Sequence, residues 1–383
     1  MLGIYERLGI RPIINARGTH TRLGGSLMAP EVLEAMREAA RSYILLDELQ
    51  DKASELIARA TGAGAGMVTG GAAAGLLLGA AACLAGDDPA RIDQLPRTDG
   101  LRDEALMHRA HRNGYDHSIR ATGATIVEVG YPHATLPFQL RAVLGERTAL
   151  VAYLISPWAS PGALSLPETC AIAHEAGVPV LVDAAASLPP AENLRRFIAE
   201  GADLVVYSGG KAINGPQSSG ILAGRPDLIR AARLNGSPSH SIGRAAKAAK
   251  EDIVGLMVAL ERYLERDHEA EVAAWRGQAE WVMRDLGGLP GVTATYQHGG
   301  MEHHTPRVEL VFAPDAGIDA RELIAELEQH DPRIFLFAPT GPSAAPNSVV
   351  VNTHTLQPGE ERLIGAALRE TLAERLAQRQ AGV

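Results

Sequence analysis

Short apolar runs alternate with amphipathic segments along the first 220 residues. Runs rich in β-forming residues predict strands at 67–69, 105–107, 124–130, 148–156, 178–183 and 204–207. Apolar residues at helical spacing predict helices at 28–42, 49–60, 136–144, 167–176 and 194–201. Strands and helices that alternate at this spacing are typical of βαβ units, so we expect an α/β fold with a mainly parallel sheet.

The pattern changes from about residue 221 onward. Long helical periodicity covers 244–286, and further strands are expected at 292–296, 307–312, 334–337 and 348–352. Helices are expected at 318–329 and 358–379, so this part is typical of a small antiparallel α+β domain of roughly 130 residues. We therefore expect an N-terminal arm and helix at 1–45, a large domain at 46–245, and a connector helix with the small C-terminal domain at 246–383.

Composition and charge narrow the class of protein. The chain has 383 residues, of which 46% are hydrophobic and 21% charged, as in ordinary soluble proteins. The net charge of −9 and the lack of a basic tract argue against nucleic acid as the main partner. Cys83 and Cys170 give neither a disulfide framework nor a zinc site, and the apolar stretch 72–85 is too short to span a bilayer. We expect a cytoplasmic protein without a signal peptide, a resident metal or a membrane partner.

Three polar features follow predicted strands directly. Thr69 is followed by Gly70-Gly71 and a small-residue helix, an arrangement that offers free backbone N–H groups to an anion. The alternative is a close helix–sheet contact that needs glycine for space. Asp183 ends an apolar strand, where an uncompensated carboxylate is costly. Lys211 follows a strand and the turn Ser208-Gly209-Gly210, although a surface lysine in a loop is the alternative.

Ligands of parallel sheets bind at the carboxyl ends of the strands, so these three features are expected at one edge. A common ligand then needs a phosphate for the glycine turn, a cationic ring nitrogen for Asp183 and an electrophile for Lys211. Pyridoxal 5'-phosphate has all three groups, and an Asp and a Lys are the partners it requires. A nucleotide is not expected, because the chain has neither a G-x-G-x-x-G nor a G-K-[ST] motif.

Histidines gather in two stretches of the chain. His108, His111 and His117 lie with Arg109 and Arg112 in one segment, without the spacing of a metal site. This segment is interpreted either as a solvated basic helix or as a group that faces an anionic ligand. The second stretch, 298–304, contains His303 and His304; it either borders the pocket or forms a solvated loop. No metal is inferred from either stretch.

Four motifs carry a resemblance to a known family. They read IINARGTHTRLGG, VTGGAAAG, VPVLVDAAASLPP and DLVVYSGGKAINGPQSSGIL. In this order they resemble the fold-type I pyridoxal-phosphate enzymes, and more closely the selenocysteine synthase (L-seryl-tRNA selenium transferase) superfamily. The segment SGGKAINGPQSSG is most similar to the branch of D-glucosaminate-6-phosphate ammonia-lyase. The resemblance extends from about Ile13 to Thr355.

The resemblance implies an architecture and a set of cofactor contacts. It implies a seven-stranded, mostly parallel sheet in the large domain and a homo-oligomer with active sites at the dimer interface. Lys211 is then the Schiff-base lysine and Asp183 the partner of the pyridinium nitrogen. His108 or His111 lies over the ring, with His111 favoured.

Other residues receive roles from the same resemblance. The cofactor phosphate is assigned to the backbone of Gly70, Gly71 and Ala72, with help from Ser208. Gln217 and Ser218 are expected to reach the phosphate in the partner subunit. The substrate pocket is assigned to the arm residues Asn15, Arg17 and Thr19.

The chain also departs from the family. The tRNA-handling members have an N-terminal domain before the segment that starts here at Ile13, so a tRNA substrate is not expected. The family arm has a threonine where this chain has Arg17, which either recruits an anionic substrate group or pairs with an acid. Candidate anion clamps are Arg17, Arg22, Arg244, Arg307 and Arg333.

The reaction implied is an elimination with deamination. The expected substrate is a hydroxylated amino acid or amino-sugar acid, with or without a phosphate group. Aminotransfer, racemisation, aldol cleavage and β-replacement remain alternatives within the same cofactor chemistry, and a non-catalytic cofactor-binding homologue is a more distant one.

Overall fold

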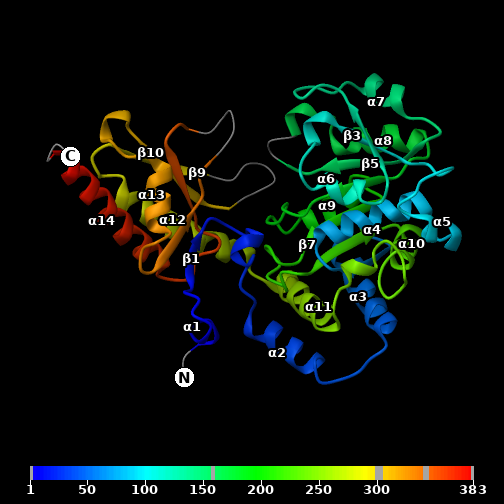
Figure 1. Cartoon of the computed structure of the whole chain (residues 1–383), viewed down its shortest axis with the longest axis horizontal. Helices are drawn as coiled ribbons and strands as arrows, with labels where there is room; N and C mark the ends of the chain where they lie inside the picture. The colour runs from blue at the N-terminus through cyan, green and yellow to red at the C-terminus, as the bar shows by residue number, and fades with distance from the viewer. Residues whose placement is uncertain (1–2, 157–159, 298–304, 340–344, 381–383) are drawn as a thin grey trace. The chain divides into compact units, whose positions relative to one another are not determined.

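The computed structural model describes residues 3–156, 160–297, 305–339 and 345–380. The chain divides into two units, drawn in Figure 1. The large unit is continuous and covers Ser26–Arg266. The small unit combines Met1–Gly25 with Asp267–Val383.

The large unit is built on a seven-stranded sheet in the order β2-β8-β7-β6-β5-β3-β4. Its strands are β2 (Ala65–Thr69), β3 (Glu104–His108), β4 (Thr125–Val129), β5 (Thr148–Leu154), β6 (Val180–Asp183), β7 (Leu204–Ser208) and β8 (Gly220–Gly224). Only β8 runs antiparallel to its neighbours β2 and β7, while the pairs from β7 to β4 are parallel. The expectation of a mainly parallel sheet is confirmed.

Strand β8 was not expected from the sequence, because GILAG contains two glycines and little β-forming character. Contacts between backbones explain the glycines. A Cβ atom at Gly224 would lie 2.0 Å from the carbonyl oxygen of Asp203, and one at Gly220 would lie 2.6 Å from the carbonyl carbon of Gly71. Glycine inside a strand is typical of such close approach.

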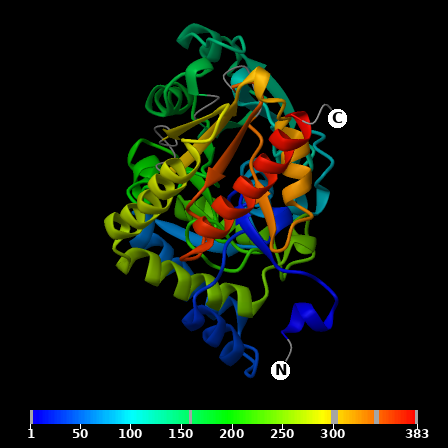
Figure 2. The same ribbon diagram turned by 90° about the vertical axis from the view of Figure 1, so that its left-hand side faces the viewer.

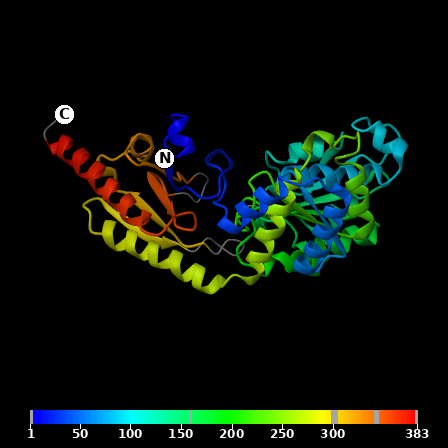
Figure 3. The ribbon, with the colours of Figure 1, turned by 90° about the horizontal axis from the view of Figure 1, so that it is seen from below.

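Helices cover both faces of this sheet, as Figure 3 shows. One face carries α2 (Pro30–Ala39), α3 (Leu46–Thr61), α7 (Pro137–Val143), α8 (Leu166–Glu175), α9 (Asn193–Ala199) and α11 (Lys250–Glu265). The other carries α4 (Ala72–Ala85), α5 (Pro89–Gln94), α6 (Asp116–Arg120) and α10 (Pro226–Leu234). Helix α5 begins with Pro89, and Asp88 caps it by accepting the N–H of Ala90.

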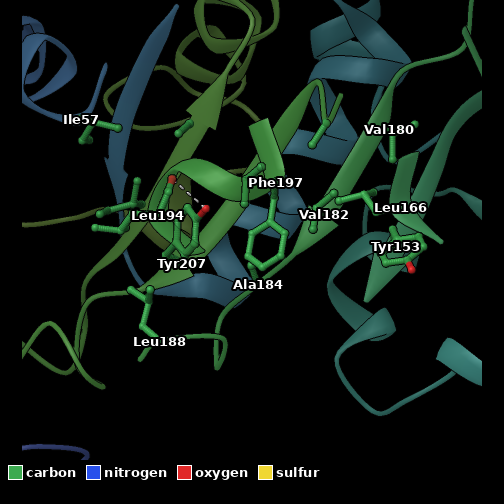
Figure 4. Packing of buried hydrophobic residues seen from close by; sticks show 14 of the residues in the cluster. Ile57, Tyr153, Leu166, Val180, Val182, Ala184, Leu188, Leu194, Phe197 and Tyr207 are labelled. Atoms are coloured by element: carbon green, nitrogen blue, oxygen red, sulfur yellow. Dashed lines mark hydrogen bonds between the residues drawn. The ribbon is translucent and has the colours of Figure 1, made fainter. Parts of the chain in front are cut away.

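Strand β7 shows how the two cores are separated. Val205 and Tyr207 face the first core, whereas Leu204 and Val206 face the second, as the alternation of a strand requires. Figure 4 shows the first core, where the buried Tyr207 hydroxyl donates to the carbonyl of Leu194 at 3.1 Å. The same hydroxyl lies 2.9 Å from the carbonyl of Asn193. The strand that leads to Lys211 is therefore fixed by apolar packing on both faces.

The small unit contains a three-stranded antiparallel sheet, β12-β10-β9. Its strands are β9 (Val292–Gln297), β10 (Arg307–Phe312) and β12 (Ser348–Asn352), and its helices are α12 (His268–Leu286), α13 (Ala320–Leu327) and α14 (Glu360–Gln380). Figure 2 shows α12 and α14 beside each other against this sheet. A separate pair, β1 (Ile13–Ala16) and β11 (Arg333–Leu336), is parallel, and the short α1 (Ile4–Arg7) precedes it. The expected antiparallel α+β character is confirmed.

Short 3-10 helices complete the structure. They are η1 (Thr21–Leu23), η2 (Arg109–His111), η3 (Ser160–Gly162), η4 (Arg244–Ala246) and η5 (Pro314–Ala316). The long helix expected at 244–286 is two helices, α11 and α12. Arg266 and Asp267 separate them, and Asp267 caps α12 by accepting the N–H of Ala270 at 2.9 Å.

The unit boundaries differ from the expected positions at 45 and 245. Helix α2 packs against α11, so residues 26–45 and 246–266 belong to the large unit. The arm belongs to the small unit, because β1 pairs with β11. None of the helices in the described part of the chain is both long and apolar enough to cross a membrane.

Candidate active site

Four strand ends place polar groups at one edge of the large sheet. Asp183 ends β6, Ser208 ends β7, Thr69 ends β2 and His108 ends β3. Because β2 and β7 both run antiparallel to β8, their carboxyl ends lie at the same edge as those of the other parallel strands. The sequence prediction of one shared edge is thus met for the glycine turn, Asp183 and the lysine segment.

Lys211 lies in a tight loop three residues past Ser208, the end of β7. The loop folds back on itself: a Cβ at Gly210 would lie 2.5 Å from the Cα of Gln217, and one at Gly209 would lie 2.2 Å from the hydroxyl of Ser219. Ser26 donates its hydroxyl to the carbonyl of Gly210 at 3.1 Å. The two glycines therefore allow the turn that holds the lysine at the sheet edge.

Burial shifts Lys211 and Asp183 in opposite directions. The pKa of Lys211 is lowered by burial, and the nearby Asp183 carboxylate partly offsets this effect. Burial raises the pKa of Asp183. The hydrogen bond that Asp183 accepts from the N–H of Ala185 at 3.1 Å and the charge of Lys211 both oppose this shift. A second cation beside Asp183 would stabilise its ionised form, so the site fits a ligand with a protonated ring nitrogen.

The glycine turn and helix α4 after it are compatible with both interpretations of the sequence. Close packing is real, since a Cβ at Gly75 of α4 would lie 3.0 Å from Val206 Cγ1. At the same time Gly71 has a φ of +107°, and a Cβ there would meet nothing within 4 Å. Helix α4 begins at Ala72, so its free N–H groups lie at the same turn as Gly70 and fit a phosphate group.

His108, His111 and Tyr153 form a buried aromatic cluster. The ring centroids of His111 and Tyr153 lie 4.5 Å apart, and those of the two histidines 5.0 Å apart. Burial lowers the pKa of His108 to about 4, and burial together with His108 lowers the pKa of His111 to about 3. Both rings are therefore neutral near neutral pH.

The hydrogen bonds of this cluster set the proton position on His111. The N–H of Leu154 donates to His111 Nδ1 at 3.2 Å, so the neutral ring carries its proton on Nε2. Within the described part of the chain, that Nε2 and both ring nitrogens of His108 have no hydrogen-bond partner. Tyr153 was not a candidate from the sequence; its position at the end of a buried strand was the only signal.

The remaining candidates lie on the surface or in the small unit. Gln217 and Ser218 are exposed, and the Ser218 hydroxyl donates to Asp252 at 3.1 Å. In the small unit, Asn15 Nδ2 donates to the carbonyl of Gly18 at 3.0 Å and fixes the turn that includes Arg17.

The arm turn is also tied to the small sheet. Asn352 donates from Nδ2 to the carbonyl of Arg17 at 3.0 Å, and Thr355 donates to the carbonyl of Asn15 at 2.6 Å. Thr19 is partly buried beside this turn. The Nε of Arg17 is buried without a partner among the described residues. The arm turn is thus held in place by several hydrogen bonds.

The candidate arginines differ in their surroundings. Arg22 and Arg244 are exposed. Arg307 donates from Nε to Gln297 at 3.0 Å, and burial lowers its pKa. Arg333 donates from Nε to the carbonyl of Glu328 at 2.8 Å, and this hydrogen bond fixes its side chain. His303 and His304 lie outside the described residues, and the described residues contain no group of three or more His, Cys, Asp or Glu that could hold a metal ion.

Comparisons with known proteins identify the relatives of this chain. The family model of L-seryl-tRNA selenium transferase (SelA) matches residues 116–274. The chain is 34% identical over 380 residues to D-glucosaminate-6-phosphate ammonia lyase of Salmonella typhimurium strain 14028s, covering 98% of this chain and 99% of that protein. It is 33% identical to 5'-C-glycyluridine monooxygenase-decarboxylase of a Streptomyces species, covering 87% and 83% of the two chains.

A solved structure extends the match to three dimensions. The structure of a D-glucosaminate-6-phosphate ammonia-lyase superposes with a TM-score of 0.85 at 33% identity, covering 98% of this chain and 100% of that chain. The sequence match and the structural match both indicate the same family. The chain belongs to the SelA-like superfamily of fold-type I pyridoxal-phosphate enzymes, in the family of D-glucosaminate-6-phosphate ammonia-lyase.

Proposed function

We propose that this protein is a pyridoxal-phosphate-dependent lyase that removes ammonia from a phosphorylated amino-sugar acid such as D-glucosaminate 6-phosphate. The observation that carries the proposal is the pair of Lys211 and Asp183 at one sheet edge. It occurs in a chain that matches an ammonia-lyase over 99% of that relative's length.

Lys211 acts as the base of the reaction. Its lowered pKa favours the neutral amine, which removes the proton from the α-carbon of the substrate. Asp183 would hold a proton on the ring nitrogen of the cofactor. When bound, pyridoxal phosphate accepts the electron pair released at the α-carbon.

The overall reaction balances without an oxidant. The substrate loses the α-hydrogen and the β-hydroxyl group as water. The resulting enamine becomes an imine, and one water molecule hydrolyses it to a 2-keto acid and ammonia. The net change is therefore the loss of ammonia alone.

The other residues receive positioning roles in this proposal. The phosphate of the cofactor is assigned to the turn Gly70-Gly71-Ala72 and to Ser208. His111 is assigned to the face of the cofactor ring, and His108 is the alternative for this position. Their neutral, buried rings suit a flat aromatic partner rather than an anion.

Substrate recognition and assembly complete the proposal. The substrate is assigned to Asn15, Arg17 and Thr19, with the Arg17 guanidinium as an anion contact. The active protein is a homo-oligomer, at least a dimer, in which the exposed Gln217 and Ser218 reach the partner's phosphate site. We place the enzyme in the cytoplasm and expect no nucleic-acid partner.

A substrate assay tests the reaction. The purified protein, loaded with pyridoxal phosphate, is mixed with D-glucosaminate 6-phosphate, unphosphorylated D-glucosaminate or serine, and ammonia and 2-keto acid are measured. We expect equal amounts of both products, with the phosphorylated sugar acid preferred. Keto acid without ammonia indicates aminotransfer, inverted substrate indicates racemisation, and oxygen uptake with carbon dioxide indicates the chemistry named for the Streptomyces relative; each result would refute the lyase proposal.

Lys211 is tested separately by chemical trapping. The chain has four lysines, Lys52, Lys211, Lys247 and Lys250, so the modified residue can be identified by peptide mass after borohydride reduction. We expect the pyridoxyl group on Lys211 alone, and Lys211→Ala should lose the visible absorbance of the bound cofactor. Lys250→Ala is the matched control, and a label on any other lysine contradicts the assignment.

A further inference from the structure

Strand β2 is the edge strand of the large sheet and has an open side. It pairs with β8 on one side, and no described strand pairs with it on the other. In an antiparallel pair, alternate residues turn their N–H and C=O groups away from the partner. On β2 these residues are Gly66 and Val68, so their backbone groups need other partners.

Helix α3 supplies those partners through two side chains one helical turn apart. Gln50 accepts the N–H of Val68 through Oε1 at 3.0 Å and donates from Nε2 to the carbonyl of Val68 at 2.9 Å. Ser54 accepts the N–H of Gly66 through its hydroxyl at 3.0 Å. A single glutamine thus satisfies both backbone groups of one residue, as a neighbouring strand would.

The contact between Gln50 and Val68 also affects the turn that follows strand β2. Val68 comes immediately before Thr69, Gly70 and Gly71, the turn assigned to the cofactor phosphate. Gln50 holds the strand on its open side, while Thr69 pairs with Gly220 of β8 on the other side. Gly70 and Gly71, which follow, have wide backbone freedom. The orientation of their N–H groups therefore depends on how firmly the end of strand β2 is held.

We propose that Gln50 is a positioning residue that orders the phosphate-binding turn and raises the affinity for the cofactor phosphate. The proposal rests on the assignment of that turn under the proposed function. A turn that is ordered before binding does not lose conformational entropy when the phosphate arrives. Ser54 makes the same kind of contact farther from the turn and serves as its natural comparison.

The surroundings of Gln50 indicate that its variants will fold. A cavity of about 410 Å³ lies beside Gln50 and Ser54 and is also lined by Arg230, Arg233 and Ser237. Water in this cavity can replace the lost side-chain groups at Val68. Loss of the glutamine amide therefore loosens the strand end without leaving buried polar groups unsatisfied.

The test compares two ligands that differ only in the phosphate. Apo-protein is titrated with pyridoxal 5'-phosphate and with pyridoxal, and each dissociation constant is measured by absorbance. In Gln50→Met we expect the dissociation constant for pyridoxal phosphate to rise about tenfold, from the loss of two neutral hydrogen bonds. The constant for pyridoxal, which has no phosphate to place at the turn, should stay within about twofold, and the control Ser54→Ala should change neither constant by more than that.

Further outcomes decide between the proposal and its rivals. Equal losses for both ligands in Gln50→Met, or the same loss in Ser54→Ala, would show a general structural role and overturn the proposal. If Gln50→Met does not fold, Gln50→Glu keeps the acceptor for the Val68 N–H and loses the donor, so an intermediate, phosphate-selective loss is expected. A wild-type protein that binds both ligands equally would refute the phosphate assignment itself, whereas a wild-type preference that survives in both Gln50 variants refutes only the role of Gln50.

Discussion

The buried histidine pair makes the stability of the apo-protein depend on pH. His108 and His111 are 1% and 0% exposed, with pKa values of about 4 and about 3. In the unfolded chain both titrate near the ordinary value of about 6.5. Between these limits the unfolded state binds more protons than the folded state, so stability is lost as the pH falls below about 6.5.

The magnitude follows from the size of the shifts. A pH of 5.5 lies about one unit below the pKa of each histidine in the unfolded chain, so these rings are mostly protonated there. In the folded protein both rings remain neutral at this pH. One unit corresponds to about 1.4 kcal/mol, so the pair should lower the free energy of unfolding by about 3 kcal/mol between pH 7.5 and 5.5. This is a large share of a typical stability of about 5–15 kcal/mol.

Urea unfolding of the apo-protein, followed by circular dichroism at the two pH values, measures the effect. The control is the double variant His108→Phe/His111→Asn, which removes both titrating rings. The asparagine oxygen can still accept the N–H of Leu154. We expect the wild-type loss to exceed that of the variant by about 3 kcal/mol. An equal loss in the two proteins would refute the burial argument, because other groups would then cause the whole effect.

Two further predictions concern the sheet edge. Gly220→Ala would place a Cβ 2.6 Å from the carbonyl carbon of Gly71, so we expect a stability loss of about 1–3 kcal/mol and weaker binding of pyridoxal phosphate, measured by thermal unfolding and titration. Its control, Gly277→Ala, adds a Cβ with nothing within 4 Å in a helix and should stabilise by about 0.5–1 kcal/mol; a harmless Gly220→Ala contradicts the packing. Asp183→Asn removes the charge that raises the pKa of Lys211, so the amine should react with 5-nitrosalicylaldehyde at a lower pH than in the wild type; an unchanged pH profile shows that the two groups do not interact.

The sequence predicted those parts of the fold in which local pattern and tertiary packing agree. Strand β7 is an apolar run with side chains buried on both faces, so the turn before Lys211 could be placed from its residues. Asp183 was found in the same way, as a carboxylate after an apolar strand. Strand β8 was missed because its residues are selected for close backbone contact, which has no period along the chain.

Other features depend on partners that are distant in sequence. The pairing of β1 with β11 joins segments whose own patterns carry no signal of each other. The contacts of Gln50 with Val68 depend on how α3 lies along β2, and a glutamine on a helix surface is ordinary in sequence. The tautomer of His111 likewise required the position of the Leu154 N–H.

The pairing of β1 with β11 also has a consequence for biosynthesis. Ile13 pairs with Arg333, so the ribosome must add about 320 residues after the first strand before its partner exists. At about 5–20 residues per second this interval is roughly 16–64 s. The continuous segment 26–266 is synthesised completely during this interval and can fold first, while the N-terminal arm stays exposed to chaperones and proteases. Strand β1 is therefore synthesised long before the strand with which it pairs.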